Sequence, residues 1–197
     1  GHLAKDFKDV LFTLPDTETV LPYFLERVSG HSPDRTAEFI VKIPQIPAEG
    51  ITLYVFYGNA FAESISSPQQ TFDFYEDFST PGLDPEKWSA RVSPSGSALV
   101  SQAGLLLDAA GISSRSFQFK GGLIEYAATA ETGSEVRLMI RDPDPDSGAV
   151  ITQVAYASAY SGAQHCIAVG NIVKANDAKP LVASVRYNFR IMVDADN

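Results

Sequence analysis

Residues 54–60 read YVFYGNA, and residues 71–79 read TFDFYEDFS. Both runs place aromatic or apolar residues at alternate positions, which is the spacing of side chains on one face of a β-strand. Gly58 and Asn59 end the first run with residues typical of turns, and the second run starts a new alternation. The two runs therefore predict that one β-domain ends and another begins between them.

The predicted boundary lies in residues 61–71, a polar segment that contains Ser66-Ser67-Pro68. We interpret this segment as a short linker between two units, residues 1–65 and residues 72–197. A long loop inside a single domain is the alternative interpretation.

The same period of two recurs along the chain and predicts an all-β fold. The clearest case is VRYNFRIMV at residues 185–193, where apolar and polar residues alternate. Gly-containing turns separate further candidate strands, which favours two antiparallel β-sandwich or jelly-roll units. The candidates are residues 39–43, 51–57, 98–101, 105–107, 117–119, 123–129, 135–140, 150–157 and 166–169.

Helix signals are weak in this sequence. Pro22 interrupts the tempting segment 17–27, because proline lacks the amide hydrogen that a helix interior needs. The best candidate for a helical turn is residues 84–87, where Asp84 can cap the turn and Pro85 fits its first position. Such a turn would hold Trp88 against a core.

The totals exclude some classes of function. The 197 residues carry a formal net charge of −9, with 45% hydrophobic and 20% charged residues. A folded acidic protein of this kind lacks the clustered Lys and Arg that nucleic-acid binding requires. No apolar run reaches the roughly 20 residues that span a bilayer. The single cysteine, Cys166, allows no intramolecular disulfide.

Several short motifs resemble the DUF2341 family. These are DFKDV at residues 6–10, LPY at 21–23, FIVKIPQIP at 39–47 and YVFYGNA at 54–60. The resemblance covers residues 4–62, with Phe24 where the family usually has Trp and Ala60 where it usually has Pro. By comparison with the family pattern, we expect further strands before Asp6.

The following part is similar to a concanavalin A-like (laminin G-like) jelly roll. The residues that carry this resemblance are FDFYEDFS at 72–79, LDPEKW at 83–88, FKGGLIE at 119–125 and YNFRIMV at 187–193. The two modules in this order imply a large secreted or surface-anchored protein of archaea or bacteria. The resemblance thus implies an extracellular or cell-surface location, and strands that would follow Asp194.

Missing strands would leave open sheet edges, which recruit strands from a neighbour. We therefore expect either a fragment of a larger chain or a partner chain that completes the sheet. The candidate partners are a glycan or another surface protein.

The sequence carries no motif that is typical of an enzyme. Glucanases of the concanavalin A-like superfamily place an acidic cluster of the form Glu-x-Asp-x-(x)-Glu on one strand, but residues 149–170 contain neither Asp nor Glu. Two histidines besides His2 are too few for a typical zinc site. We expect a protein without catalytic residues.

The best metal candidate is the segment RDPDPDSG at residues 141–148. Asp142, Asp144 and Asp146 alternate and precede Gly148, and carboxylates in this arrangement can converge on Ca²⁺. An acidic, proline-rich hairpin loop is the alternative. Glu76-Asp77 is a second candidate for Ca²⁺, with ordinary surface carboxylates as the alternative.

Tyr156 and Tyr160 lie four residues apart in a region rich in Ser and Gly, and aromatic rings stack on sugars. They are candidate ligand-binding residues, with packing in a core as the alternative. The expected function is a non-catalytic extracellular module for adhesion, glycan binding or surface-structure assembly. The alternatives are an accessory fragment of a carbohydrate-active enzyme and a structural subunit of a filament or coat assembled by strand exchange.

Overall fold

The structure is a computed structural model, and it confirms the all-β prediction. It describes residues 2–115, 117–119, 121–140, 152–158, 165–169, 172–177 and 181–193. The strands of these ranges pair antiparallel throughout, and the described helix is a single turn. The resemblance of the second part to a concanavalin A-like jelly roll stays a prediction.

The chain divides into two compact units, Gly1–Arg115 and Ser116–Asn197. This division falls later than the predicted boundary in residues 61–71. The hairpin of residues 88–114 contacts the residues before it, because the Trp88 ring packs against Phe74 and Phe78 and its Nε1 donates to Glu76. The predicted assignment of residues 72–115 to the second module stays a prediction.

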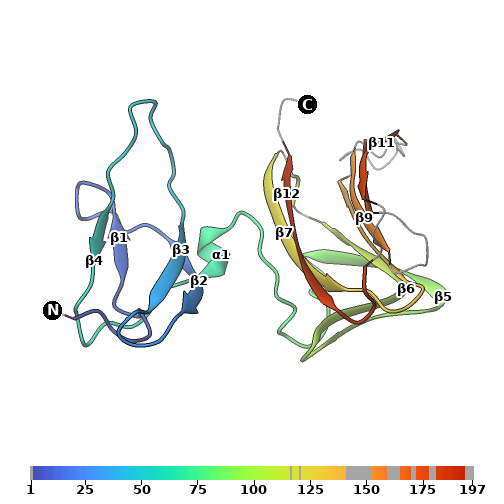
Figure 1. Ribbon diagram of the computed structural model, residues 1–197, viewed down its shortest axis with the longest axis horizontal. Helices are drawn as coiled ribbons and strands as arrows, with labels where there is room; N and C mark the ends of the chain where they lie inside the picture. Colours follow the sequence, from blue (N-terminus) through green and yellow to red (C-terminus); the bar gives the residue numbers. More distant parts are fainter. Residues whose placement is uncertain are drawn as a thin grey trace. The chain divides into compact units, whose positions relative to one another are not determined.

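The first unit begins with two short ribbons of paired strands (Figure 1). In the first ribbon, β1 (Leu11–Thr13) pairs with β4 (Tyr54–Phe56). In the second, β2 (Tyr23–Ser29) pairs with β3 (Thr36–Val41). Thr13 of β1, Tyr23 of β2 and Leu21 just before β2 are fully buried, so the core forms around β1 and the start of β2.

This core is aromatic. Phe12, Tyr23 and Phe39 meet edge to face, with ring centroids 5.3 to 5.7 Å apart, which is a preferred geometry for aromatic pairs. The Tyr23 hydroxyl donates to the backbone oxygen of Val10 at 2.8 Å, so its buried polar atom is satisfied. Phe7, Val10 and Leu21 complete the buried cluster.

The bridge between the two aromatic runs packs against β2. The Ser67 amide donates to the Tyr23 carbonyl at 2.9 Å, and the Ser66 hydroxyl accepts from the Leu25 amide at 2.9 Å. Ser67 then caps the helical turn α1 (Pro68–Thr71), whose first position is a proline. The predicted linker is therefore an ordered cover for one edge of β2.

A long hairpin follows, formed by β5 (Trp88–Ser101) and β6 (Gly104–Ser114). The predicted turn at residues 84–87 lies at its base: the Asp84 carboxylate accepts from the Glu86 amide at 2.8 Å, and the Trp88 amide donates to the Asp84 carbonyl at 2.9 Å. The Arg115 amide donates to the Lys87 carbonyl at 2.8 Å and closes the hairpin.

The second unit contains a two-stranded sheet of β7 (Gly122–Thr129) and β12 (Arg186–Val193). It also contains a four-stranded sheet in the order β11-β10-β9-β8. These strands are β8 (Glu135–Ile140), β9 (Thr152–Ser158), β10 (His165–Val169) and β11 (Ile172–Asp177).

A small core in this unit surrounds Ala130 and Leu181. Tyr126 stacks on Phe189 with centroids 4.7 Å apart, and burial raises the pKa of Tyr126 to about 12. Its hydroxyl oxygen is buried, and no residue that the structure describes forms a hydrogen bond with it.

Three differences from the predicted strands have identifiable causes. Residues 117–119 form no strand, since the positive φ values of Gly121 and Gly122 put the start of the ladder at Gly122. β1 and β2 were not predicted, because their apolar residues do not alternate strictly. β11 was not predicted, because IVKAND carries polar residues over its second half.

Candidate functional site

β4 and the turn after it expose aromatic side chains to solvent. All three residues of β4 are exposed, with Val55 at 50% and Phe56 at 45%. Tyr57 follows at 61% and Phe61 at 93%. Alternate residues of a strand point to opposite faces, so β4 exposes apolar side chains on both of its faces. We call Tyr54, Val55, Phe56, Tyr57 and Phe61 the β4 aromatic segment.

The exposure of β4 has a cause in the fold. β1 turns Phe12 and Thr13 into the core, and Leu53, just before β4, packs against the same core. β4 follows Leu53 and forms the outer strand of its ribbon. In the described sheet β1 is its one neighbour. A large exposed apolar segment of this kind is more often a contact surface than a chance feature.

Asp9 fixes the turn that follows β4. Its side chain is 5% exposed, and its two carboxylate oxygens accept from the Ala4 amide at 2.9 Å and the Gly58 amide at 2.7 Å. Burial raises the pKa of Asp9, but hydrogen bonds from the Gly58, Ala4 and Asp9 amides and the charge of Lys8 hold the pKa below its ordinary value. Gly58 has a φ of +94°, a conformation that favours glycine, so the turn depends on both residues.

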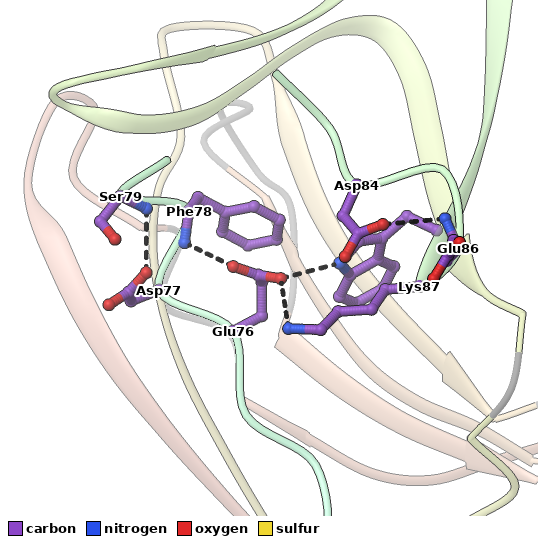
Figure 2. Close-up of polar contacts among 8 residues, drawn as sticks. Glu76, Asp77, Phe78, Ser79, Asp84, Glu86 and Lys87 are labelled. Carbon is purple, nitrogen blue, oxygen red and sulfur yellow. Dashed lines mark hydrogen bonds and ion pairs between the residues drawn. The ribbon is translucent and has the colours of Figure 1, made fainter. Parts of the chain in front are cut away.

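A second polar arrangement surrounds Glu76 (Figure 2). One oxygen of its carboxylate accepts from the Phe78 amide at 3.0 Å, and the other accepts from Lys87 Nζ and Trp88 Nε1, each at 3.3 Å. The Trp88 ring packs against Phe74 and Phe78, with centroids 5.2 and 5.7 Å away. Glu76 therefore joins the aromatic run of residues 71–79 to the base of the β5–β6 hairpin.

These contacts bear on the second Ca²⁺ candidate. The donors around Glu76 include an ammonium group, which would repel a cation at the same oxygen. In Asp77, hydrogen bonds from the Ser79 hydroxyl and amide lower the pKa of the carboxyl group. The geometry favours a structural role for Glu76, and Ca²⁺ binding at Glu76-Asp77 stays a prediction.

The other predicted site residues lie largely beyond what the structure describes. Asp142, Asp144, Asp146 and Tyr160 are outside the described residues. Tyr156 belongs to β9, where the register places it between Arg137 of β8 and Cys166 of β10. The prediction of a ligand site at Tyr156 and Tyr160 thus remains a prediction.

Within the described ranges, no group of three or more His, Cys, Asp or Glu residues could hold a metal ion. In the same ranges, no helix is both long enough and apolar enough to cross a bilayer. Neither finding identifies a ligand.

Sequence reasoning noticed the aromatic run of β4 but interpreted it only as the end of a domain. The signal that could have identified a surface was the absence of alternation with polar residues. YVFY has apolar or aromatic residues at every position, so both faces of the strand are apolar and at least one of them needs a partner. Either a buried central strand or an exposed contact strand fits that pattern. Only the position of β4 at the edge of its ribbon distinguishes the two.

Comparison with known protein families finds a match in the first part of the chain. Residues 6–91 match the family model described as "Domain of unknown function (DUF2341)". The match confirms the predicted resemblance and extends it past residue 62, through the bridge and the Glu76 cluster to the start of β5. The family description names no activity. No curated protein and no solved structure is significantly similar to the chain.

Proposed function

We propose that this protein is a non-catalytic module of the extracellular space or cell surface, used for adhesion, glycan binding or assembly of a surface structure. The β4 aromatic segment is its contact surface. The observation that carries the proposal is that β4 exposes apolar side chains on both faces, with Tyr57 and Phe61 even more exposed beside it. Aromatic side chains provide large contact area at low cost in conformational entropy, which suits them to binding surfaces.

The turn anchored by Asp9 supports this role. A binding surface needs side chains held in place before the partner arrives, because ordering them on binding lowers affinity. The hydrogen bond from the Gly58 amide to Asp9 fixes the backbone directly after Tyr57. The Asn59 side chain accepts from the Phe61 amide at 3.0 Å and orders the turn that carries Phe61.

The test is co-sedimentation of the protein with intact cells of the organism that produces it. We expect the wild type to pellet with the cells. The double variant Tyr57→Ser/Phe61→Ser should lose about tenfold in affinity, the loss expected when two aromatic side chains are removed from a binding surface. Met192→Ser is the matched control, because it removes a side chain that is 71% exposed in the second unit.

The proposal fails if the wild type does not pellet, or if the double variant and the control behave alike. Release of reducing sugar from the cell surface by the wild type would instead favour a carbohydrate-active enzyme.

A further inference from the structure

The backbone of β4 has an open side at Val55. β1 is bonded on both sides: it pairs with β4, and on its other side the Leu21 amide donates to the Phe12 carbonyl at 2.9 Å. In an antiparallel ladder, a residue directs both its amide and its carbonyl to the same neighbour. Phe12 therefore directs both groups toward Leu21 and away from β4.

Val55 lies directly opposite Phe12 in the register. It consequently forms the non-hydrogen-bonded pair of the ribbon, and its own amide and carbonyl point away from β1. Tyr54 and Phe56, opposite Thr13 and Leu11, form the hydrogen-bonded pairs that hold β4 to β1. Since β4 has no second neighbour in the described sheet, the polar groups of Val55 face an open edge.

The other described edges are protected, and this edge is not. Residues 19–21 cover the free side of β1, and the Ser66-Ser67 segment covers β2. The other described strands at sheet edges carry charged side chains, which discourage pairing with another chain. In the strands whose side chains the structure describes, these charged residues are Glu38 of β3, Arg91 of β5, Asp108 of β6, Glu125 of β7, Arg137 of β8 and Arg190 of β12. β4 consists of Tyr, Val and Phe, with neither a charge nor a proline.

The surroundings of β4 in the sequence are acidic. Residues 43–70 contain Glu49 and Glu63 and no Lys, Arg or His. Both glutamates are exposed, and Glu63 stays 89% exposed although Lys8 Nζ lies 3.8 Å from it. A second copy of residues 43–70 would bring these glutamates together with no cation from the same segment, whereas a basic segment would be attracted to them.

We propose that β4 receives an extended segment of a partner polypeptide as an added strand, paired through the amide and carbonyl of Val55. The segment has apolar side chains at its centre, to cover both faces of β4, and Lys or Arg at its ends. This inference rests on the proposed function and names its partner class.

The experiment titrates the full chain with the peptide KTVIVTK and follows binding by the anisotropy of a dye on the peptide. The variant Val55→Pro removes the outward amide, and proline is tolerated where the amide of an edge strand faces solvent. Val55→Ala is the matched control, because it keeps the amide and shortens the side chain. We expect Val55→Pro to weaken binding about tenfold and Val55→Ala about twofold.

Two control peptides test the chemistry of the partner. ETVIVTE is expected to bind about threefold more weakly than KTVIVTK, and this difference should vanish at high salt. KTPIPTK cannot form the ladder and should not bind. As a measurement independent of any variant, hydrogen exchange at the Val55 amide of the wild type should slow when KTVIVTK is added.

Equal binding by Val55→Pro and wild type, or unchanged exchange at the Val55 amide, overturns the added strand. If Val55→Pro still pellets with cells while Tyr57→Ser/Phe61→Ser does not, the contact surface stands but its partner is recognised through side chains, as a glycan would be. If the wild type binds neither cells nor peptide, the proposed function fails together with the inference.

Discussion

β1 and β4 pair with each other over three residues but have opposite environments. Phe12 and Thr13 of β1 are buried, whereas their partners Val55 and Tyr54 of β4 are exposed. The outer side of β1 is bonded to residues 19–21, whereas β4 has no described neighbour beyond β1. Two of the three residues of β1 and all three of β4 are apolar or aromatic, so hydrophobicity alone does not explain the difference.

The difference teaches that the burial of β1 serves stability, whereas the exposure of β4 fits the contact surface proposed above. The apolar residues of β1 face an aromatic core, where their burial contributes to folding. Those of β4 contribute little to folding and instead keep an apolar surface available. Three measurements can break or sharpen this comparison.

The largest effect is expected from truncating one phenylalanine in each strand. Phe12→Ala should destabilise the protein by about 3–5 kcal/mol, because it opens a cavity among Tyr23 and Phe39. Phe56→Ala should cost about 1 kcal/mol or less, because its side chain is already half in water. Urea unfolding followed by circular dichroism measures both. Similar losses in the two variants would mean that β4 is part of the core after all.

A smaller effect is expected at the covered edge of β2. Ser66→Ala removes the hydroxyl that accepts from the Leu25 amide and should cost about 1 kcal/mol. Ser66→Thr keeps a hydroxyl at the same place and should restore most of the loss. If the alanine variant is as stable as the wild type, the bridge does not protect this edge, and the contrast with β4 loses one of its supports.

The smallest effect is expected from the pH dependence of the Asp9 anchor. The pKa of Asp9 lies below its ordinary value in the folded state. The ionised carboxylate therefore stabilises the fold at pH values above the unfolded pKa near 3.8, and this contribution is lost as the pH falls through the lower folded pKa. Asp9→Asn should melt at a lower temperature than the wild type at pH 7. The two melting temperatures should converge as the pH falls well below 3.8. Curves that stay parallel over this range would show that the Asp9 charge does not hold the turn.

Much of the fold could be predicted from the sequence, because strict alternation is a local signal. The strands around residues 123–129, 135–140 and 186–193 follow from the period of two, and the turn at 84–87 follows from Asp84-Pro85. β1 and β2 could not be predicted in this way. Their residues take part in a core that includes Phe39 and Leu53, and this long-range packing, not local alternation, decides their structure.

The proposed contact surface was harder to predict, because the sequence does not state which neighbours a strand has. YVFY is compatible with a central strand and with an exposed edge, and the direction of the Val55 amide depends on a hydrogen bond between Phe12 and Leu21. Likewise, Ser66 and Ser67 look like linker residues until their bonds to β2 are known. The resemblance to the DUF2341 family identified the region correctly but carried no information on these contacts.

Trp88 is the single tryptophan of the chain, and Glu76, Phe74 and Phe78 surround it. Its intrinsic fluorescence is therefore sensitive to the packing between the aromatic run of residues 71–79 and the base of the β5–β6 hairpin. Circular dichroism averages over every strand instead. If the emission of Trp88 changes at a lower denaturant concentration than the circular dichroism signal, the packing around Trp88 is lost before the sheets unfold. Unfolding would then not be two-state.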